Sequence, residues 1–179
     1  MGTNIYVLVN KFSSWKKIID GYKEENKNTY QSECNKSDEI FSHLDKFNDK
    51  EICYKSMYYL NDIQGKYPTK NHAGCIYLYY WLYDNCKTEC NSTEIKNIFN
   101  KFIEKYESTG DPIHTDYKKI NITKDEFERL KDIYSLNPNT DEAGTKNDEE
   151  YCDKFKSIYE KHQKECDYNT QSHFCNALE

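Results

Sequence analysis

The 179-residue sequence lacks a long apolar run, and its longest covers only nine residues, from Cys75 to Tyr83. A helix that spans a bilayer needs about 20 apolar residues, so no segment of this sequence has the pattern of a membrane span. The sequence also lacks a basic charge balance, because 25 Lys and Arg residues stand against 31 Asp and Glu residues, for a net charge of −6. This balance excludes the overall positive field that attracts nucleic acid.

Signatures of catalysis are also missing. The six glycines form no phosphate-binding loop, and neither a GxSxG nucleophile elbow nor an HExxH zinc motif occurs. His72 and Cys75 lie close enough in sequence to suggest a thiol nucleophile, but cysteines that are able to pair favour a structural role. We therefore expect a protein that is not an enzyme and that uses no cofactor and no metal.

Aromatic residues, in contrast, are abundant. They make up 15% of the chain, with 17 Tyr and 8 Phe, although 31% of the residues are charged. Disordered chains usually have few aromatic rings, whereas these rings offer enough apolar surface for a packed core. The composition thus predicts a folded domain with a polar surface.

Cysteine indicates the compartment. An even count of eight favours four disulfides formed in an oxidising environment, at Cys34, Cys53, Cys75, Cys86, Cys90, Cys152, Cys166 and Cys175. Two alternatives stay open: free buried thiols, and zinc held by neighbouring His and Cys residues, although no CxxC spacing supports zinc.

The pairing of the cysteines is only partly constrained by their spacing. Cys152 and Cys166 are 14 residues apart on one predicted helix, or roughly 21 Å, which is too far for a disulfide. We expect Cys166 to pair with Cys175, and Cys53 to pair with Cys86 or Cys90 across an antiparallel hairpin.

Helical periodicity dominates the chain, and no strand pattern of useful length occurs. Asn91 and Glu94 form a capping box before an amphipathic helix that ends at Glu107, ahead of Gly110. Further helices are predicted over Asp38–Phe47 and Asp49–Ile63, after Thr123, and after Asn147; the last carries Tyr151, Phe155, Ile158, Tyr159 and His162 on one face. The predicted fold class is all-α, a disulfide-stapled helical bundle.

One segment, Ala73–Cys86, contains a run, CIYLYYWLY (75–83), that is apolar or aromatic on every side. A helix of this kind is normally enclosed by other helices, so we expect it at the centre of the bundle, with Leu78, Trp81 and Leu82 in the core. The alternative is an exposed platform on which a ligand stacks.

We expect a single domain over residues 1–179, with an N-terminal helical segment at 1–33 and a flexible loop at 137–147. The N-terminus has only a short apolar run and no cleavage motif, so it is not an ordinary signal peptide. Either a signal was removed or export uses another route.

The loop from Ser108 to Asn121 is the candidate for partner binding, because it holds more apolar side chains than a solvated loop needs: Ile113, His114, Tyr117 and Ile120. Two interpretations stay open. These side chains fold back onto the bundle, or they form an exposed apolar patch used for contact.

Four segments resemble the Plasmodium interspersed repeat family, and its vivax-type members most closely. They are CYKSMYYLNDI (53–63), CIYLYYWLYDNC (75–86), NIFNKFIEKYE (97–107) and EYCDKFKSIYEKHQKECDYNTQSHFC (150–175). The C-x-Y-L-Y-Y-W-L core is the most specific part, and together the segments cover most of residues 34–175.

The resemblance implies a non-enzymatic variant surface antigen of a malaria parasite, exported to the infected red-cell membrane. Family members typically have a cysteine-rich helical ectodomain, a linker, a membrane anchor and a cytoplasmic tail, and they usually lack a standard signal peptide. The implied partner is a host cell-surface protein, which the antigen binds in adhesion and immune evasion. Binding to nucleic acid is not expected. An alternative is a parasite-side structural or export-complex component without a host receptor, and a small-molecule or metal-binding enzyme is the weakest reading.

Overall fold

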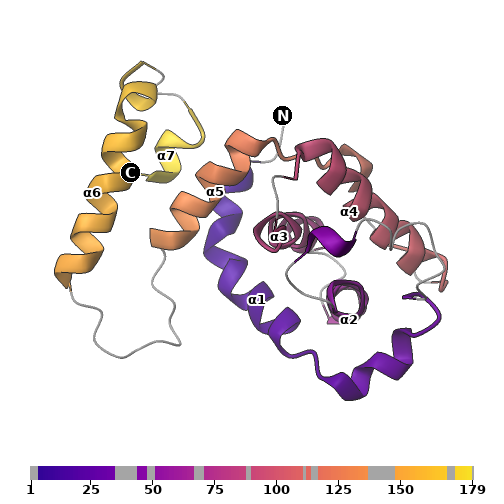
Figure 1. The fold of residues 1–179 in the computed structure, drawn as a ribbon. Helices are drawn as coiled ribbons and strands as arrows, with labels where there is room; N and C mark the ends of the chain where they lie inside the picture. Colours follow the sequence, from indigo (N-terminus) through magenta and orange to yellow (C-terminus); the bar gives the residue numbers. More distant parts are fainter. Residues whose placement is uncertain are drawn as a thin grey trace. The chain divides into compact units, whose positions relative to one another are not determined.

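The computed structural model describes residues 4–34, 44–47, 51–66, 71–87, 90–110, 112–113, 117–136, 148–168 and 172–178. These residues form helices and turns, with no strand beyond an isolated bridge between Phe47 and Cys86 (Figure 1). The α-helices are α1 (Phe12–Asp20), α2 (Ile52–Lys66), α3 (Asn71–Asp84), α4 (Ser92–Glu107), α5 (Lys124–Leu136), α6 (Asp148–Tyr168) and α7 (Cys175–Leu178). The 3₁₀ helices η1 (Ile5–Lys11), η2 (Glu24–Tyr30) and η5 (Tyr117–Lys119) accompany them, and a further 3₁₀ turn covers residues 44–46. The all-α prediction is confirmed.

The chain divides into two compact units. The terminal unit combines Met1–Ser13 with Asp125–Glu179, and the middle unit covers Ser14–Lys124. The predicted N-terminal helical segment, 1–33, contains η1, α1 and η2 in its described part. The predicted flexible loop, 137–147, lies outside the described residues, as does most of the helix expected over 38–47. That residues 1–179 form a single domain stays a prediction.

The core of the middle unit is built around α3, which packs against α2 and α4. Every α3 residue from Gly74 to Tyr83 is buried, including Leu78, Trp81 and Leu82. Because the helix is enclosed on all sides, the platform interpretation of this segment is wrong and the central-helix prediction is confirmed. Its polar atoms are used inside the core, where the Tyr59 hydroxyl of α2 donates to the Gly74 carbonyl of α3 at 2.9 Å.

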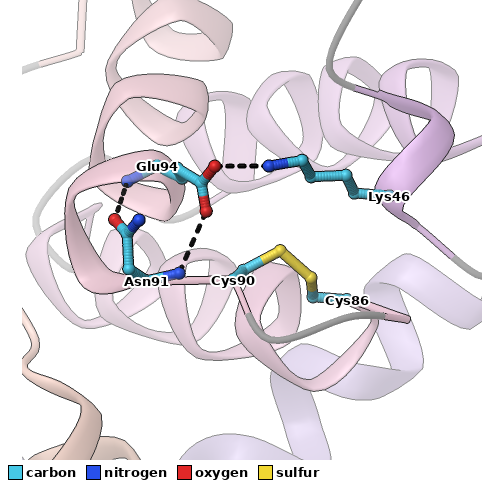
Figure 2. The surroundings of a disulfide bond; sticks show 5 residues. All are labelled: Lys46, Cys86, Cys90, Asn91 and Glu94. Carbon is cyan, nitrogen blue, oxygen red and sulfur yellow. Dashed lines mark hydrogen bonds and ion pairs between the residues drawn. A yellow bond between two sulfur atoms is a disulfide. The ribbon is translucent and has the colours of Figure 1, made fainter.

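Helix α4 begins where its capping box predicts. The Asn91 side chain accepts a hydrogen bond from the Glu94 amide at 2.9 Å, and Glu94 accepts one from the Asn91 amide at 3.1 Å (Figure 2). Lys46 forms an ion pair with the same Glu94 carboxylate. The helix then buries one stripe of side chains: Ile95, Ile98, Phe99, Phe102, Ile103 and Tyr106. After α4, Gly110 adopts a positive φ of 112°, a conformation that costs glycine little.

Two of the three disulfides lie in the middle unit, and their pairing differs from the predicted one. Cys34 pairs with Cys53 at a Cα–Cα distance of 5.8 Å, and Cys86 pairs with Cys90 (Figure 2). The prediction of Cys53 with Cys86 or Cys90 is therefore wrong. The reason lies in packing: η2 packs against α2, which brings Cys34 to the first turn of α2, while the turn between α3 and α4 is short enough to be closed on itself.

The terminal unit contains η1, α5, α6 and α7. Its core includes Tyr6, Phe127, Leu130, Ile158 and Phe174, and the rings of Tyr6 and Phe174 meet edge to face at 5.5 Å. The third disulfide, Cys166–Cys175, ties the end of α6 to α7, as predicted. Within this unit the helix predicted after Asn147 is α6, which is 21 residues long.

Two cysteines are free, so the prediction that all eight are oxidised is wrong. Cys75 is fully buried in α3, where a thiol packs as a small apolar side chain, and this fits the buried-thiol alternative. Cys152 is exposed on α6. Neither position was distinguishable from the paired cysteines by sequence spacing.

Candidate functional site

The loop between α4 and α5 buries most of the residues expected to contact a partner. Ile113, Tyr117 and Ile120 are only 5%, 6% and 5% exposed, and His114 lies outside the described residues. The interpretation in which these side chains fold back onto the bundle is confirmed for the three described residues. The exposed-patch interpretation is wrong for the same three, because their apolar surface is already covered.

A single carboxylate at the end of α4 holds this loop in place. One oxygen of Glu107 accepts a hydrogen bond from the Ile113 amide at 3.1 Å, and the other accepts one from the Tyr117 hydroxyl at 3.0 Å. Gln64 adds a bond to the Pro112 carbonyl at 3.0 Å. Burial, together with the Glu107 carboxylate, raises the pKa of Tyr117 to about 12, so this hydroxyl keeps its proton and donates throughout the physiological range.

The chemistry available in the middle unit is limited. Burial raises the pKa of the Cys75 thiol to about 12, and the negative charge of Glu107 adds to the effect. A thiol of this kind is neutral at pH 7 and is a poor nucleophile, because the thiolate is the reactive form. The candidate thiol nucleophile beside His72 is therefore a core side chain. In the described part of the chain, no group of three or more His, Cys, Asp or Glu side chains is placed to hold a metal ion.

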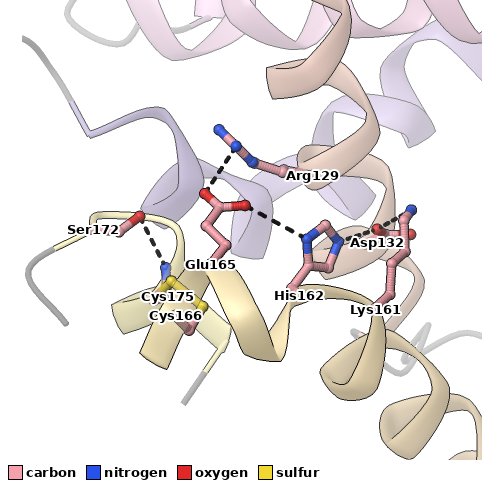
Figure 3. Close-up of polar contacts among 8 residues, drawn as sticks. All are labelled: Arg129, Asp132, Lys161, His162, Glu165, Cys166, Ser172 and Cys175. Carbon is pink, nitrogen blue, oxygen red and sulfur yellow. Dashed lines mark hydrogen bonds and ion pairs between the residues drawn. A yellow bond between two sulfur atoms is a disulfide. The ribbon is translucent and has the colours of Figure 1, made fainter. Parts of the chain in front are cut away.

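The terminal unit contains a chain of alternating charges between α5 and α6 (Figure 3). His162 Nε2 lies 2.7 Å from Asp132 Oδ2, and Lys161 donates to the same oxygen at 2.7 Å. On the other side, Arg129 pairs with Glu165 at 2.8 Å, and His162 Nδ1 lies 3.8 Å from the Glu165 carboxylate. Sequence reasoning placed His162 on the inner face of α6 but missed this network.

The surroundings of the network indicate a structural role. The His162 ring is buried and meets the Phe174 ring edge to face at 4.6 Å. Burial raises the pKa of Tyr6, and a hydrogen bond with Arg129 offsets part of that rise. The signal that could have found the network is the three-residue spacing of Arg129 and Asp132, repeated by His162 and Glu165, which puts each pair on one helix face.

These ion pairs also define how α5 and α6 align. Asp132 contacts Lys161 and His162, whereas Arg129, one turn earlier, contacts Glu165, one turn later. The two helices are therefore antiparallel, and in this register Leu136, the last residue of α5, lies level with Ile158. Residues 150–157 of α6 extend beyond the end of α5 by about 12 Å.

This extension and the turn that follows it carry an exposed aromatic surface that the sequence did not reveal. Residues 150–157 are all exposed, and Tyr151, Phe155 and Tyr159 show 38%, 39% and 43% of their surface. The Phe155 and Tyr159 rings stack with centroids 6.3 Å apart. We name Tyr151, Phe155 and Tyr159 the α6 aromatic face. Sequence reasoning put these rings on one face with Ile158 and His162, but the structure buries only the latter two; Tyr151 and Phe155 lie beyond the end of α5.

No helix of the described segments is long and apolar enough to cross a membrane. Neither a curated protein nor a solved structure matches the chain. A family described as Plasmodium vivax Vir protein matches residues 6–178, a range that includes both units and all eight cysteines. A match of this extent establishes the family: the chain belongs to the Plasmodium vivax Vir protein family, which marks it as a variant surface antigen of the malaria parasite.

Proposed function

We propose that this chain is the ectodomain of a non-enzymatic variant surface antigen that binds a host cell-surface protein or red-cell ligand. In this proposal it acts at the membrane of the infected red cell, in adhesion and immune evasion, with the native protein anchored in that membrane. The observation that carries the proposal is the family match over residues 6–178.

Helix α4 has one buried face and one exposed face, which supports an antigen whose surface residues can change while its fold persists. Ile95, Phe99 and Ile103 are buried on one face, and Asn97 and Lys101 are exposed on the other. Replacements at exposed helix positions usually change stability by no more than about 0.5 kcal/mol, whereas losses from the buried stripe cost several times more. Antibodies select against exposed residues, so such a scaffold suits an antigen under immune pressure.

The disulfides support a location outside the reducing cytosol. The paired cysteines are separated in sequence by 19 residues in Cys34–Cys53, by 4 in Cys86–Cys90 and by 9 in Cys166–Cys175. Cross-links of this kind persist in oxidising environments and reinforce small extracellular domains. Export to the red-cell surface is the location that we propose on this basis.

We place the receptor contact on exposed polar helix surface, because the apolar residues of the α4–α5 loop are covered. The outer face of α4 is a suitable test surface: Asn97, Lys101 and Glu104 are exposed and follow one another at helical spacing. A typical stable interface covers about 800 Å² on each partner, so it would extend beyond these three side chains.

The test is a binding screen of the oxidised protein against purified host cell-surface proteins and intact red cells. We expect saturable binding to a host protein, abolished when the disulfides are reduced. A charge reversal of Lys101→Glu should weaken binding if α4 takes part, and Lys124→Glu on α5 is the matched control. Binding that is confined to parasite proteins would refute the proposal and favour the parasite-side structural or export role.

A further inference from the structure

The α6 aromatic face continues an interface that the terminal unit already uses. Ile158 and His162 of α6 are buried within this unit, and Tyr151 and Phe155 extend the same helical stripe toward the start of α6. Only the second half of the stripe has a partner helix, because α5 ends level with Ile158. The first half is an amphipathic surface without a cover in the described part of the chain.

The described part of the chain offers few exposed apolar surfaces to match it. Within the described residues, the exposed large apolar side chains are the three of the α6 aromatic face together with Val7 and Tyr168; the middle unit has none. The linker at 137–147 reads NPNTDEAGTKN, whose most apolar members are one proline and one alanine. Among the surfaces of the described residues, the one that best complements the α6 aromatic face is therefore the same face on another molecule.

We propose that a second copy of this chain docks on the α6 aromatic face, with the two α6 helices antiparallel. A two-fold interface must be self-complementary, and the charges next to the face meet this condition. Glu150 and Lys154 are both exposed and lie one helical turn apart, on either side of the level of Cys152. In an antiparallel pair centred on Cys152, Glu150 of each copy lies level with Lys154 of the other.

The rings fit the same register. Tyr151 of one copy lies level with Asp153 of the other, two residues or about 3 Å along the helix from Phe155, so the two rings are near enough to interact as an aromatic pair. A parallel pair would instead place Glu150 level with Glu150 and Lys154 level with Lys154, which is repulsive. Two half-exposed rings on each copy, Tyr151 and Phe155, supply well under the roughly 800 Å² of a standard interface, so the dimer is weak and depends on protein concentration.

Sedimentation velocity of the full oxidised chain over a range of concentrations tests the proposal. The decisive variant is Phe155→Asp, which puts a charge in the centre of the face. Its matched control is Ser157→Asp, an equal change at an exposed residue two positions along, on the opposite side of α6. We expect wild type and Ser157→Asp to dimerise alike, and Phe155→Asp to dimerise roughly 30-fold more weakly.

Cys152 provides an independent measure, because it is the exposed free thiol among the described cysteines and lies next to Tyr151. A short bis-maleimide adds to two thiols without any oxidant, so it should link two copies through Cys152. The covalent dimer should be absent in Cys152→Ser and strongly reduced in Phe155→Asp. A wild type that stays monomeric at all concentrations, or a Phe155→Asp variant that dimerises and cross-links as well as Ser157→Asp, would overturn the proposal.

Discussion

Removing the hydroxyl of Tyr59 should weaken the middle unit by a definable amount. Tyr59 is fully buried, and its hydroxyl donates to the Gly74 carbonyl at 2.9 Å; burial raises its pKa well above 10, so it stays a donor. Tyr59→Phe keeps the ring, which meets Trp15 at 6.4 Å and Tyr77 at 5.9 Å, and deletes only the hydrogen bond. A buried hydrogen bond contributes about 1 kcal/mol, and its loss removes the polar contact between α2 and α3, so we expect a cost of about 1–2 kcal/mol.

Urea unfolding followed by tryptophan fluorescence measures this cost in the right place, because both tryptophans, Trp15 and Trp81, belong to the middle unit. The midpoint should fall while the m-value stays constant, which indicates a change of stability without a change in the unfolded state. Tyr54→Phe, at a half-buried position of the same helix, is the control and should change stability by less than about 0.5 kcal/mol. If Tyr59→Phe costs no more than this control, the hydrogen bond between α2 and α3 does not stabilise the core.

Three further predictions concern the core, the thiols and the terminal unit. Trp81→Ala should lower the free energy of unfolding by about 3–5 kcal/mol, measured by circular dichroism, since it leaves a cavity in a helix enclosed on all sides; an unchanged melting temperature would contradict this. Iodoacetamide should label the exposed Cys152 in the folded protein, whereas Cys75, buried and with its pKa raised to about 12, should be labelled only after unfolding; mass spectrometry that finds both labelled in the native state would refute the assignment. Replacing Cys166 and Cys175 together by alanine should cost about 2–3 kcal/mol, because the disulfide closes a short loop of 9 residues of separation; hydrogen exchange that stays unchanged in α6 and α7 would argue against it.

Local signals predicted much of the fold. The capping box of Asn91 and Glu94 determines where α4 begins, because its side chains accept hydrogen bonds from the backbone amides of Glu94 and Asn91, which have no acceptor within the helix. The all-round apolar pattern of Ala73–Cys86 predicted a buried helix, since no face of it is compatible with water. Both signals lie within a few residues of sequence, so they do not depend on the rest of the chain.

The candidate site was harder to predict. Ile113, Tyr117 and Ile120 carry the same apolar composition whether they cover the bundle or face a partner, and only the hydrogen bonds from the Ile113 amide and the Tyr117 hydroxyl to Glu107 decide between the two. Likewise, the stripe that includes Phe155 reads as one amphipathic face. Its exposure follows from the point at which α5 ends, a fact about another helix.

The sequence by itself determined the helical class and the aromatic core, because periodicity, helix caps and composition are properties of neighbouring residues. The family followed from the resemblance of four sequence segments and from the match over residues 6–178. Tertiary structure alone decided the cysteine pairing, since a disulfide needs two Cα atoms within about 7 Å and the eight cysteines carry no local mark of their partners. It also decided which apolar residues are covered. Burial depends on what lies opposite: Ile158, level with the end of α5, is buried, whereas Phe155 lies beyond that end and is exposed.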